Sequence, residues 1–407
     1  MLYILFVLLL NFLIPFTPWC PSFFSFGRFI VFGGIVFFVF LGSVLFSKTT
    51  KHAFPKKFLK PLYLFIGFAL LRSLFASAVS YRIILLGFLV GFFFILFYYL
   101  WPILKNLKAY EKLLNTITIF SLTIFLPTFI FFILGKQQGW MMGRFRGILS
   151  NSNQLGVSIA ILAPLLLASS IMEKKFFLKY LLRLIISFTF LAILISGSRS
   201  GVIAFTIGMV CFFILDRHRS SMRHTLFAVL LLLIFLIVLL LFYDTVVGSL
   251  GLIWSSVYLR GETTIEAAAN TRMVQLHNAF SVTKRHELSG LGWGGVIKEE
   301  FTFRSLQETF QNSYIQIYVA TGIIGCILAL FLFKSIIFYI IRAVRKVSLP
   351  VRSRIIANGF IAAIAAGLTN AVFESWLFVP SNYASIIFWV SVIAVIKISM
   401  QPETIQD

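Results

Sequence analysis

The sequence has few charged residues and very few acidic ones. Only 12% of its 407 residues are charged and 13 are acidic, whereas 60% are hydrophobic. A soluble chain of this length cannot bury so much apolar surface, so the composition predicts an integral membrane protein. The short alternating segments of a transmembrane barrel are missing, and the long apolar runs therefore favour helices.

Residues that bind metals are also scarce. The three cysteines, Cys20, Cys211 and Cys326, lie far apart in apolar surroundings, which indicates neither a disulfide framework nor a metal site. The segments expected outside hold no histidine or carboxylate cluster with metal-ligand spacing, so we expect no metal and no cofactor. The net charge of +22 would suggest nucleic acid in a soluble protein, but topology and anionic lipid explain it here.

The apolar runs predict an all-α membrane protein with about twelve transmembrane helices. Their expected bounds are 2–18, 26–46, 61–77, 83–103, 114–134, 152–172, 178–195, 201–215, 225–244, 313–333, 355–373 and 380–399. The first run lacks a basic region and an obvious cleavage site, so we interpret it as a span and not as a signal peptide.

The basic residues are concentrated in every second connection between the predicted spans. Loops 47–60, 104–113, 173–184, 216–224 and 334–354 and the C-terminal end hold 22 of the 35 lysines and arginines. The positive-inside rule makes that side cytoplasmic, with both termini inside. The predicted organisation is helices one to nine in 1–243, one long periplasmic loop in 244–312, and helices ten to twelve in 313–407.

Four arginines lie at or near the outer ends of the predicted spans: Arg144, Arg146, Arg199 and Arg272. With little acid nearby, they predict an anion site, although each arginine could instead extend to lipid phosphate. In GRFRGILSNSNQLG (143–156), arginines stand beside the free N–H groups of a helix N-terminus, an arrangement that suits phosphate. Capping of that helix by Ser150 or Asn151 is the alternative for its polar residues.

Three further segments carry candidate chemistry. In ISGSRSGV (195–202), a Gly/Ser turn presents Arg199, whose fork can bind a pyrophosphate bidentately. The pattern of NTRMVQLHNAF (270–280) predicts an amphipathic helix with Arg272 near its start. It is followed by SGLGWGG (289–295), in which we expect Trp293 to be exposed and to stack on a sugar ring. Plain turn chemistry is the alternative there. QNSYIQIYVATGIIG (311–325) opens a span with Gln311 and Asn312.

Together these segments resemble the O-antigen ligase and O-antigen polymerase superfamily of bacterial envelope glycosyltransferases, over roughly residues 140–375. The run from Arg144 to Gly156 fits the family pattern, except that Arg146 intervenes and Gly147 comes one place late. The resemblance implies a GT-C-like fold, an undecaprenyl-diphosphate-linked glycan donor, and an inverting, metal-independent transfer outside the inner membrane. It also implies that Arg199 and Arg272 hold the diphosphate and stabilise it as it leaves, assisted by Arg144 or Arg146.

The chain departs from the family pattern at the residue expected to act as the base, which would accept the proton of the acceptor hydroxyl. Ligases of this superfamily usually have histidine just before the Asn-Ser pair, where this chain has Gln311. Glutamine cannot take a proton at neutral pH. Glu308 is the first candidate for the base, and His277 and His286 are weaker ones. The missing histidine favours a polymerase over a ligase.

The expected catalytic residues are therefore Arg199, Arg272 and Glu308. The expected substrate-binding residues are Arg144, Arg146, Asn151, Asn153, Trp293, Gln311 and Asn312. The expected partners are the lipid bilayer, a lipid-linked oligosaccharide, a glycan or lipid A-core acceptor and a chain-length regulator, without nucleic acid. A flippase of lipid-linked sugar, a membrane scaffold and an inactive relative are the alternatives, although no internal repeat supports a transporter.

Overall fold

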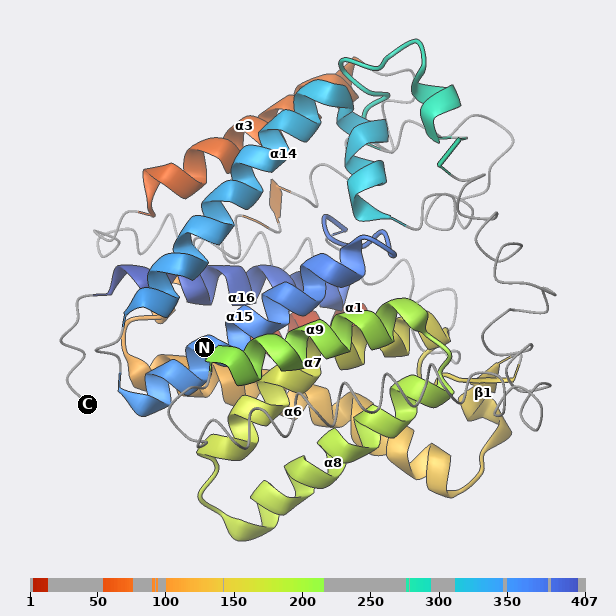
Figure 1. Cartoon of the computed structure of the whole chain (residues 1–407), viewed down its shortest axis with the longest axis vertical. Coiled ribbons are helices and arrows are strands. Elements are labelled where there is room, and N and C mark those ends of the chain that lie inside the picture. Colours follow the sequence, from red (N-terminus) through yellow and green to blue (C-terminus); the bar gives the residue numbers. More distant parts are fainter. Residues whose placement is uncertain are drawn as a thin grey trace.

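The computed structural model of the chain is a bundle of helices (Figure 1). It describes residues 3–13, 54–75, 90–91, 93, 100–141, 143–215, 276–277, 279–293, 312–346, 350–379 and 382–401. The helices are α1 (Tyr3–Leu13), α3 (Lys56–Leu74), α5 (Trp101–Ile103), α6 (Leu107–Ile133), α7 (Ser152–Met172), α8 (Phe176–Ile195), α9 (Arg199–Leu215), α14 (Ser313–Arg345), α15 (Val351–Ala371) and α16 (Tyr383–Met400). A 3₁₀ turn, η4 (Gln137–Gly139), leads into the short strands β1 (Trp140–Met141) and β2 (Arg144–Phe145).

Six of the described helices are long and apolar enough to cross a membrane: α6, α7, α8, α14, α15 and α16. The apolar helix α9 is shorter. The chain is thus an α-helical, multi-pass membrane protein. The predicted spans 26–46 and 225–244, most of 83–103 and most of the loop 244–312 lie outside the described residues. The count of twelve spans and the division at 243 and 312 therefore stay predictions.

The bounds of a helix agree closely with its apolar run where a capping residue marks the terminus. The predicted span 152–172 coincides with α7, which begins directly after the capping residue Asn151. Helix α14 continues beyond the expected end of the tenth span at 333 and reaches Arg345. Lysine and arginine are good helix formers and their long side chains reach water from within a helix, so basic residues do not end α14.

Small residues let the central helices approach one another. Helices α7, α9 and α15 pack together, and α16 lies against α7, α14 and α15 (Figure 1). A Cβ atom added to Gly208 of α9 would lie 2.9 Å from the Cβ of Ala366 in α15. One added to Gly359 of α15 would lie 2.8 Å from the Cβ of Ala168 in α7. Between membrane helices, such close contact supplies the van der Waals energy of association.

Polar contacts join the helix ends into two groups. At the first, named the Arg144 end, α7, α9 and α14 begin and α3, α8 and α15 finish. At the second, named the lysine end, α3, α6 and α15 begin and α14 and α16 finish; there the hydroxyl of Ser335 donates to the carbonyl of Lys57 at 3.1 Å and Arg352 pairs with Glu111 at 3.0 Å. The charge pattern assigns the ends within each group to one side of the membrane. Which group faces the cytoplasm stays a prediction.

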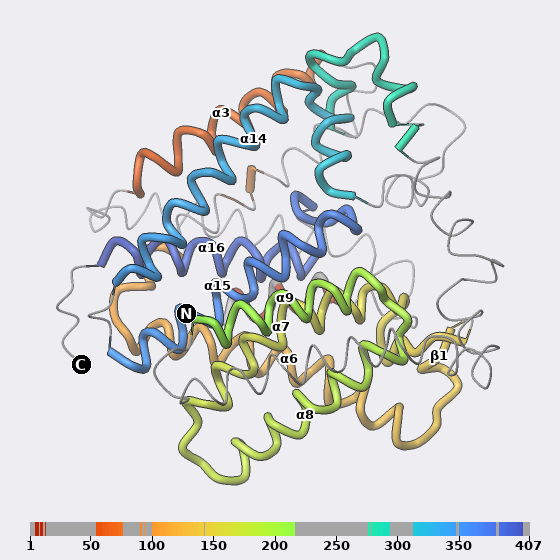
Figure 2. The backbone as a smooth tube through the Cα atoms, viewed as in Figure 1, coloured from red at the N-terminus to blue at the C-terminus, as the bar shows by residue number. Residues whose placement is uncertain are grey.

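Helix α14 is broken at Gly322, where φ is 62° and ψ is −163°. Figure 2 shows the sharp bend that results near the start of α14. A glycine-rich turn, residues 287–292, fills the break. Its N–H groups and carbonyls replace the lost helical partners: Leu291 N–H to Val319 O at 2.8 Å, Gly292 N–H to Ala320 O at 2.9 Å, Ile323 N–H to Glu287 O at 2.8 Å and Ile324 N–H to Leu288 O at 3.1 Å.

The end of α3 holds this turn in place. The Nε of Arg72 donates to the carbonyl of Gly290 at 2.8 Å, and the hydroxyl of Ser73 accepts the N–H of Trp293 at 2.8 Å. Gly290 has a φ of 70°, and a Cβ atom there would lie 2.4 Å from the backbone nitrogen of Thr321. The turn is therefore fitted between α3 and the two halves of α14, with no room for a side chain at Gly290.

We expect Gly322→Ala to destabilise the protein by at least about 2 kcal/mol, because Gly322 has a backbone conformation that residues with a Cβ atom rarely adopt. The added Cβ would also lie 2.5 Å from the carbonyl carbon of Leu288. Thermal unfolding of the purified protein in detergent measures the change. Gly67→Ala in α3 is the matched control, because a Cβ there meets nothing within 4 Å and alanine favours the helix. Equal midpoints for the two variants would contradict the expected role of the break.

Candidate functional site

The first, second and fourth sequence motifs meet at the Arg144 end, and the glycine turn of the third motif packs beside the fourth. A turn between α15 and α16, residues 372–379, completes the group. Contacts between these parts place the N-termini of α7, α9 and α14 close together, with two arginines, Arg144 and Arg199, at the same place.

A small hairpin positions Arg144. Strand β1 pairs antiparallel with β2, so that Met141 faces Arg144 across the hairpin. The ring of Phe145 is fully buried and packs against Trp140 and Phe132, with centroids 5.3 and 5.7 Å away. Because side chains alternate along a strand, burial of Phe145 turns Arg144 to the opposite face.

Arg144 begins a chain of hydrogen bonds that crosses the site. Its Nε donates to the carbonyl of Ser196 at 2.9 Å, and its Nη2 donates to Oδ1 of Asn153 at 2.9 Å. The Nδ2 of Asn153 donates in turn to Oε1 of Glu374 at 2.9 Å. The amide of Asn153 thus links a guanidinium to a carboxylate, and all three side chains are half-buried. Partial burial strengthens such charge-assisted bonds and fixes the direction of the guanidinium.

The ISGSRSGV turn places the start of α9 against the start of α7. The hydroxyl of Ser198 accepts the N–H of Gly201 at 3.3 Å. A Cβ atom on Gly156 would lie 2.2 Å from that hydroxyl, and one on Gly201 would lie 2.7 Å from the Cα of Gly156. Arg199, the first residue of α9, is half-buried beside this contact.

The Asn-Ser-Tyr run of the fourth motif fixes the start of α14. Oδ1 of Asn312 accepts the N–H groups of Tyr314 and Ile315 at 2.8 and 3.1 Å. The hydroxyl of Ser313 donates to the carbonyl of Glu374 at 2.7 Å. That same hydroxyl accepts two N–H groups of the 372–379 turn, Trp376 N–H at 3.1 Å and Leu377 N–H at 3.2 Å. The hydroxyl of Tyr314 donates to Leu368 of α15 at 3.0 Å.

The arrangement favours an anion. Each helix N-terminus carries a partial positive charge of about half a unit. Three such termini meet here with Arg144 and Arg199, and Glu374 is the acidic residue that the described contacts place among them. Backbone N–H groups at helix starts, next to guanidinium groups, are suited to phosphate or diphosphate.

Asn151 and Arg146, two of the predicted substrate-binding residues, hold the start of α7 and the hairpin before it. The side chain of Asn151 caps α7 by accepting the N–H of Asn153 at 2.8 Å, as the alternative for this motif expects. Arg146 donates to the carbonyls of Gln138 at 3.1 Å and Ser150 at 3.2 Å, and so holds the hairpin against the start of α7. Either residue's contact with a substrate stays a prediction.

The expectation of an exposed Trp293 is wrong. Its side chain is only 6% exposed and packs against Phe65 of α3 and Phe378 of the 372–379 turn. The physical reason is the break in α14: the glycine turn enters the bundle to fill it and carries the indole with it. In this conformation the ring face is not open to a sugar, and Trp293 connects the third motif to the turn that binds Ser313.

Three predicted residues, Arg272, Glu308 and Gln311, lie outside the described residues. Their positions relative to Arg199 therefore stay predictions. The weaker candidates for the base, His277 and His286, are exposed. Within the described ranges there is no group of three His, Cys, Asp or Glu residues that could hold a metal ion. Metal independence also stays a prediction.

Sequence reasoning missed Glu374 as a residue of this site. The signal that could have found it is its rarity, because the chain has only 13 acidic residues and Glu374 stands in a short turn between two apolar runs. Its partners Asn153 and Ser313 are far away in sequence, so only the folded structure brings them together.

Comparison with known families agrees with these motifs. Residues 184–330 match the family described as O-antigen ligase. The matched segment includes Arg199 of α9 and the first half of α14 with its break. No curated protein sequence matches the chain. The family match supports a glycosyltransferase-like enzyme activity on lipid-linked glycan in a membrane, and it confirms the resemblance of the chain to the O-antigen ligase and polymerase superfamily.

Proposed function

We propose that the chain is an inner-membrane glycosyltransferase that polymerises undecaprenyl-diphosphate-linked glycan units on the periplasmic face. The observation that carries this proposal is the meeting of three helix N-termini with Arg144 and Arg199 at one end of the bundle. A diphosphate fits a site of that charge, and the family match supports a lipid-linked glycan as its carrier.

In the proposed reaction, a hydroxyl oxygen of the acceptor sugar attacks the anomeric carbon of the donor from the face opposite the diphosphate. The new glycosidic bond forms as the bond from that carbon to the diphosphate oxygen breaks, which inverts the configuration. Arg199 and Arg272 stabilise the charge that develops on the leaving diphosphate, and Arg144 assists them. Donors directed at a developing negative charge commonly contribute several kcal/mol to catalysis. No metal takes part.

The acceptor's proton goes to a base, for which Glu308 remains our first candidate. Gln311 does not serve, because an amide has no basic site at neutral pH. For Glu374 we propose a positioning role. Its carboxylate accepts from Asn153 at 2.9 Å, and Asn153 accepts from Arg144 at the same distance. Glu374 thereby orients the amide that directs the guanidinium.

A ligase that transfers glycan to lipid A-core is the second candidate function, because the matched family is described as O-antigen ligase. The two activities share donor and chemistry and differ in the acceptor. Gln311, where ligases of the superfamily usually have histidine, favours the polymerase. We also propose that a chain-length regulator binds the polymerase from within the same membrane.

Envelope polysaccharide from a strain that lacks the protein distinguishes these functions on a gel. For a polymerase, we expect lipid A-core that carries a single repeat unit. For a ligase, capped core disappears while long polymer accumulates on its lipid carrier. A normal polysaccharide ladder from that strain would overturn both candidate functions. Build-up of unpolymerised lipid-linked units on the cytoplasmic face would instead indicate a flippase.

We expect Arg199→Lys and Arg272→Lys each to lower glycan output by about a hundredfold or more, although the charge is kept. A lysine lacks the planar fork that binds two phosphate oxygens at once. Complementation of the deletion strain, scored on the same gel, measures the effect. Arg285→Lys is the matched control, because Arg285 lies in the same predicted periplasmic loop as Arg272 and its side chain is exposed. Near-normal output from the Arg199 variant would indicate a nonspecific lipid contact.

The role of Glu374 is tested by two substitutions. We expect Glu374→Gln to keep output within about threefold of wild type, since the glutamine oxygen still accepts a hydrogen bond from Asn153. We expect Glu374→Ala to lose about tenfold or more, because it leaves a half-buried amide donor without a partner. If Glu374→Gln abolishes output while the protein stays in the membrane, Glu374 is the base and the positioning role is wrong.

A further inference from the structure

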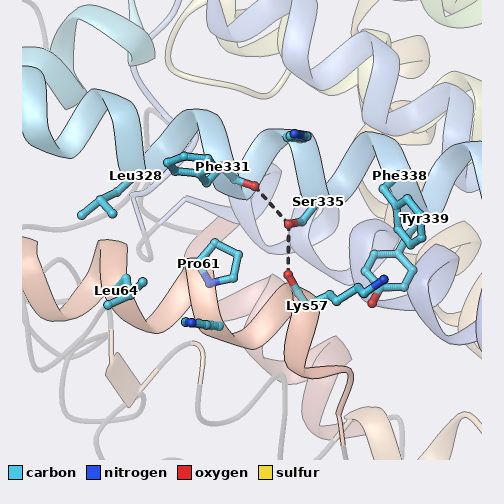
Figure 3. A pocket seen from close by; sticks show the side chains of 10 residues that line it. Lys57, Pro61, Leu64, Leu328, Phe331, Ser335, Phe338 and Tyr339 are labelled. Atoms are coloured by element: carbon cyan, nitrogen blue, oxygen red, sulfur yellow. Dashed lines mark hydrogen bonds between the residues drawn. The ribbon is translucent and has the colours of Figure 1, made fainter.

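A groove lies at the lysine end, between the first half of α3 and the second half of α14 (Figure 3). Its volume is about 580 Å³, within the usual range of small-molecule sites. The two helices lie side by side at the edge of the bundle (Figure 1). The groove is thus remote from the Arg144 end, and the proposed reaction makes no use of it.

Three lysines line this groove: Lys57 and Lys60 from α3, and Lys334 from α14. All three are exposed, and the residues that line the groove include no aspartate or glutamate. The hydroxyl of Ser335 donates to the carbonyl of Lys57 at 3.1 Å, which brings the lysines of the two helices to the same level. The ammonium of Lys57 lies 5.3 Å from the ring centroid of Phe338. Among the described residues that line the groove, positive charge therefore gathers without an acidic partner.

Apolar residues make up most of the remaining lining. Phe338 and Tyr339 follow Lys334 by about one turn of α14, and the other apolar residues extend from the lysines in the opposite direction. Leu64 lies one helical turn beyond Lys60, and Phe331 and Leu328 lie one and two turns before Ser335. At 1.5 Å per residue, the wall from α14 reaches about 10 Å and the wall from α3 about 6 Å further toward the middle of the bundle. Leu64 is 50% exposed and Phe331 54% exposed, so the walls are open at the surface of the helix pair.

We propose that this groove binds an anionic phospholipid. The lysines hold the phosphate of the head group, and one acyl chain lies along Leu64, Leu328 and Phe331. Lys57 and Lys60 lie at the start of α3, level with Lys334 of α14, where a span meets the membrane surface. From there the walls formed by Leu64, Leu328 and Phe331 run toward the hydrocarbon. From the lysines toward the middle of the bundle, a cationic surface is followed by an apolar one, which matches a lipid with a charged head and an apolar tail. Each lysine near an anionic membrane surface strengthens binding about fivefold.

The bound lipid would connect α3 and α14 at the end opposite the glycine turn. At the Arg144 end, Arg72 and Ser73 of α3 already hold the turn that fills the break of α14. At the lysine end, the pair shares the hydrogen bond between Ser335 and Lys57 and the contact between Lys57 and Phe338. A lipid phosphate there reduces repulsion between the three lysines and stabilises the pair.

The test uses the purified full-length protein in detergent, with native mass spectrometry and thermal unfolding as readouts. Phosphatidylglycerol is the probe, and phosphatidylcholine is the uncharged comparison. We expect phosphatidylglycerol to bind in one-to-one stoichiometry and to raise the unfolding midpoint, and its binding to weaken as salt is raised. Glycerol 3-phosphate, which has the head group alone, should not raise the midpoint, because it lacks the chain that contacts the apolar walls.

The triple variant Lys57→Gln, Lys60→Gln, Lys334→Gln should bind phosphatidylglycerol on the order of a hundredfold more weakly. The matched control removes three exposed lysines that do not line the groove: Lys108→Gln, Lys112→Gln, Lys174→Gln. Equal losses in the two triple variants would mean a general attraction of basic loops to anionic lipid and would overturn the proposal. Equal binding of phosphatidylcholine, or protection by glycerol 3-phosphate, would overturn it as well.

Discussion

The need to satisfy every backbone hydrogen bond inside the membrane determines how this chain is built. Hydrocarbon offers no water to an unpaired N–H or carbonyl, so a break in a spanning helix is tolerated only where protein supplies partners. Gly322 breaks α14, and the turn 287–292 supplies two donors and two acceptors. A segment of the predicted outer loop therefore becomes part of the bundle. This end of the long polar stretch forms a fixed wall beside α3 and α14.

That constraint also explains the glycines of the third and fourth motifs. Gly290 and Gly322 meet with no room for a Cβ atom on either, and each has a positive φ. Their spacing in the sequence is thus set by backbone fit. Sugar binding is not needed to account for them. The burial of Trp293 has the same origin, since the turn that fills the break carries this residue against Phe65 and Phe378.

The sequence predicts the parts of this structure that have a local signature. Apolar runs give the helices, and polar residues such as Asn151 and Asn312 mark helix starts because a cap acts on the next two or three residues. The remaining features depend on contacts between distant segments. Asn153 and Glu374 form a hydrogen bond although they are 221 residues apart, and nothing near either residue in the sequence indicates the other. The apolar run also does not predict the full length of α14, because the basic residues that follow it mark the membrane surface and not the end of a helix.

The excess of positive charge at the Arg144 end results from the way the helices pack, even without a bound substrate. The close approach of Gly156 and Gly201 brings two helix N-termini together, and Ser313 adds a third through the 372–379 turn. Partial charges of the same sign repel, so the cluster has an energetic cost unless negative charge lies nearby. Glu374 provides part of that charge, and its bond to Asn153 opposes the positive charge of Arg144. With Arg199 included, positive charge remains in excess. A diphosphate bound there would stabilise the packing of the same helices that position it, which couples substrate binding to the stability of this end of the bundle.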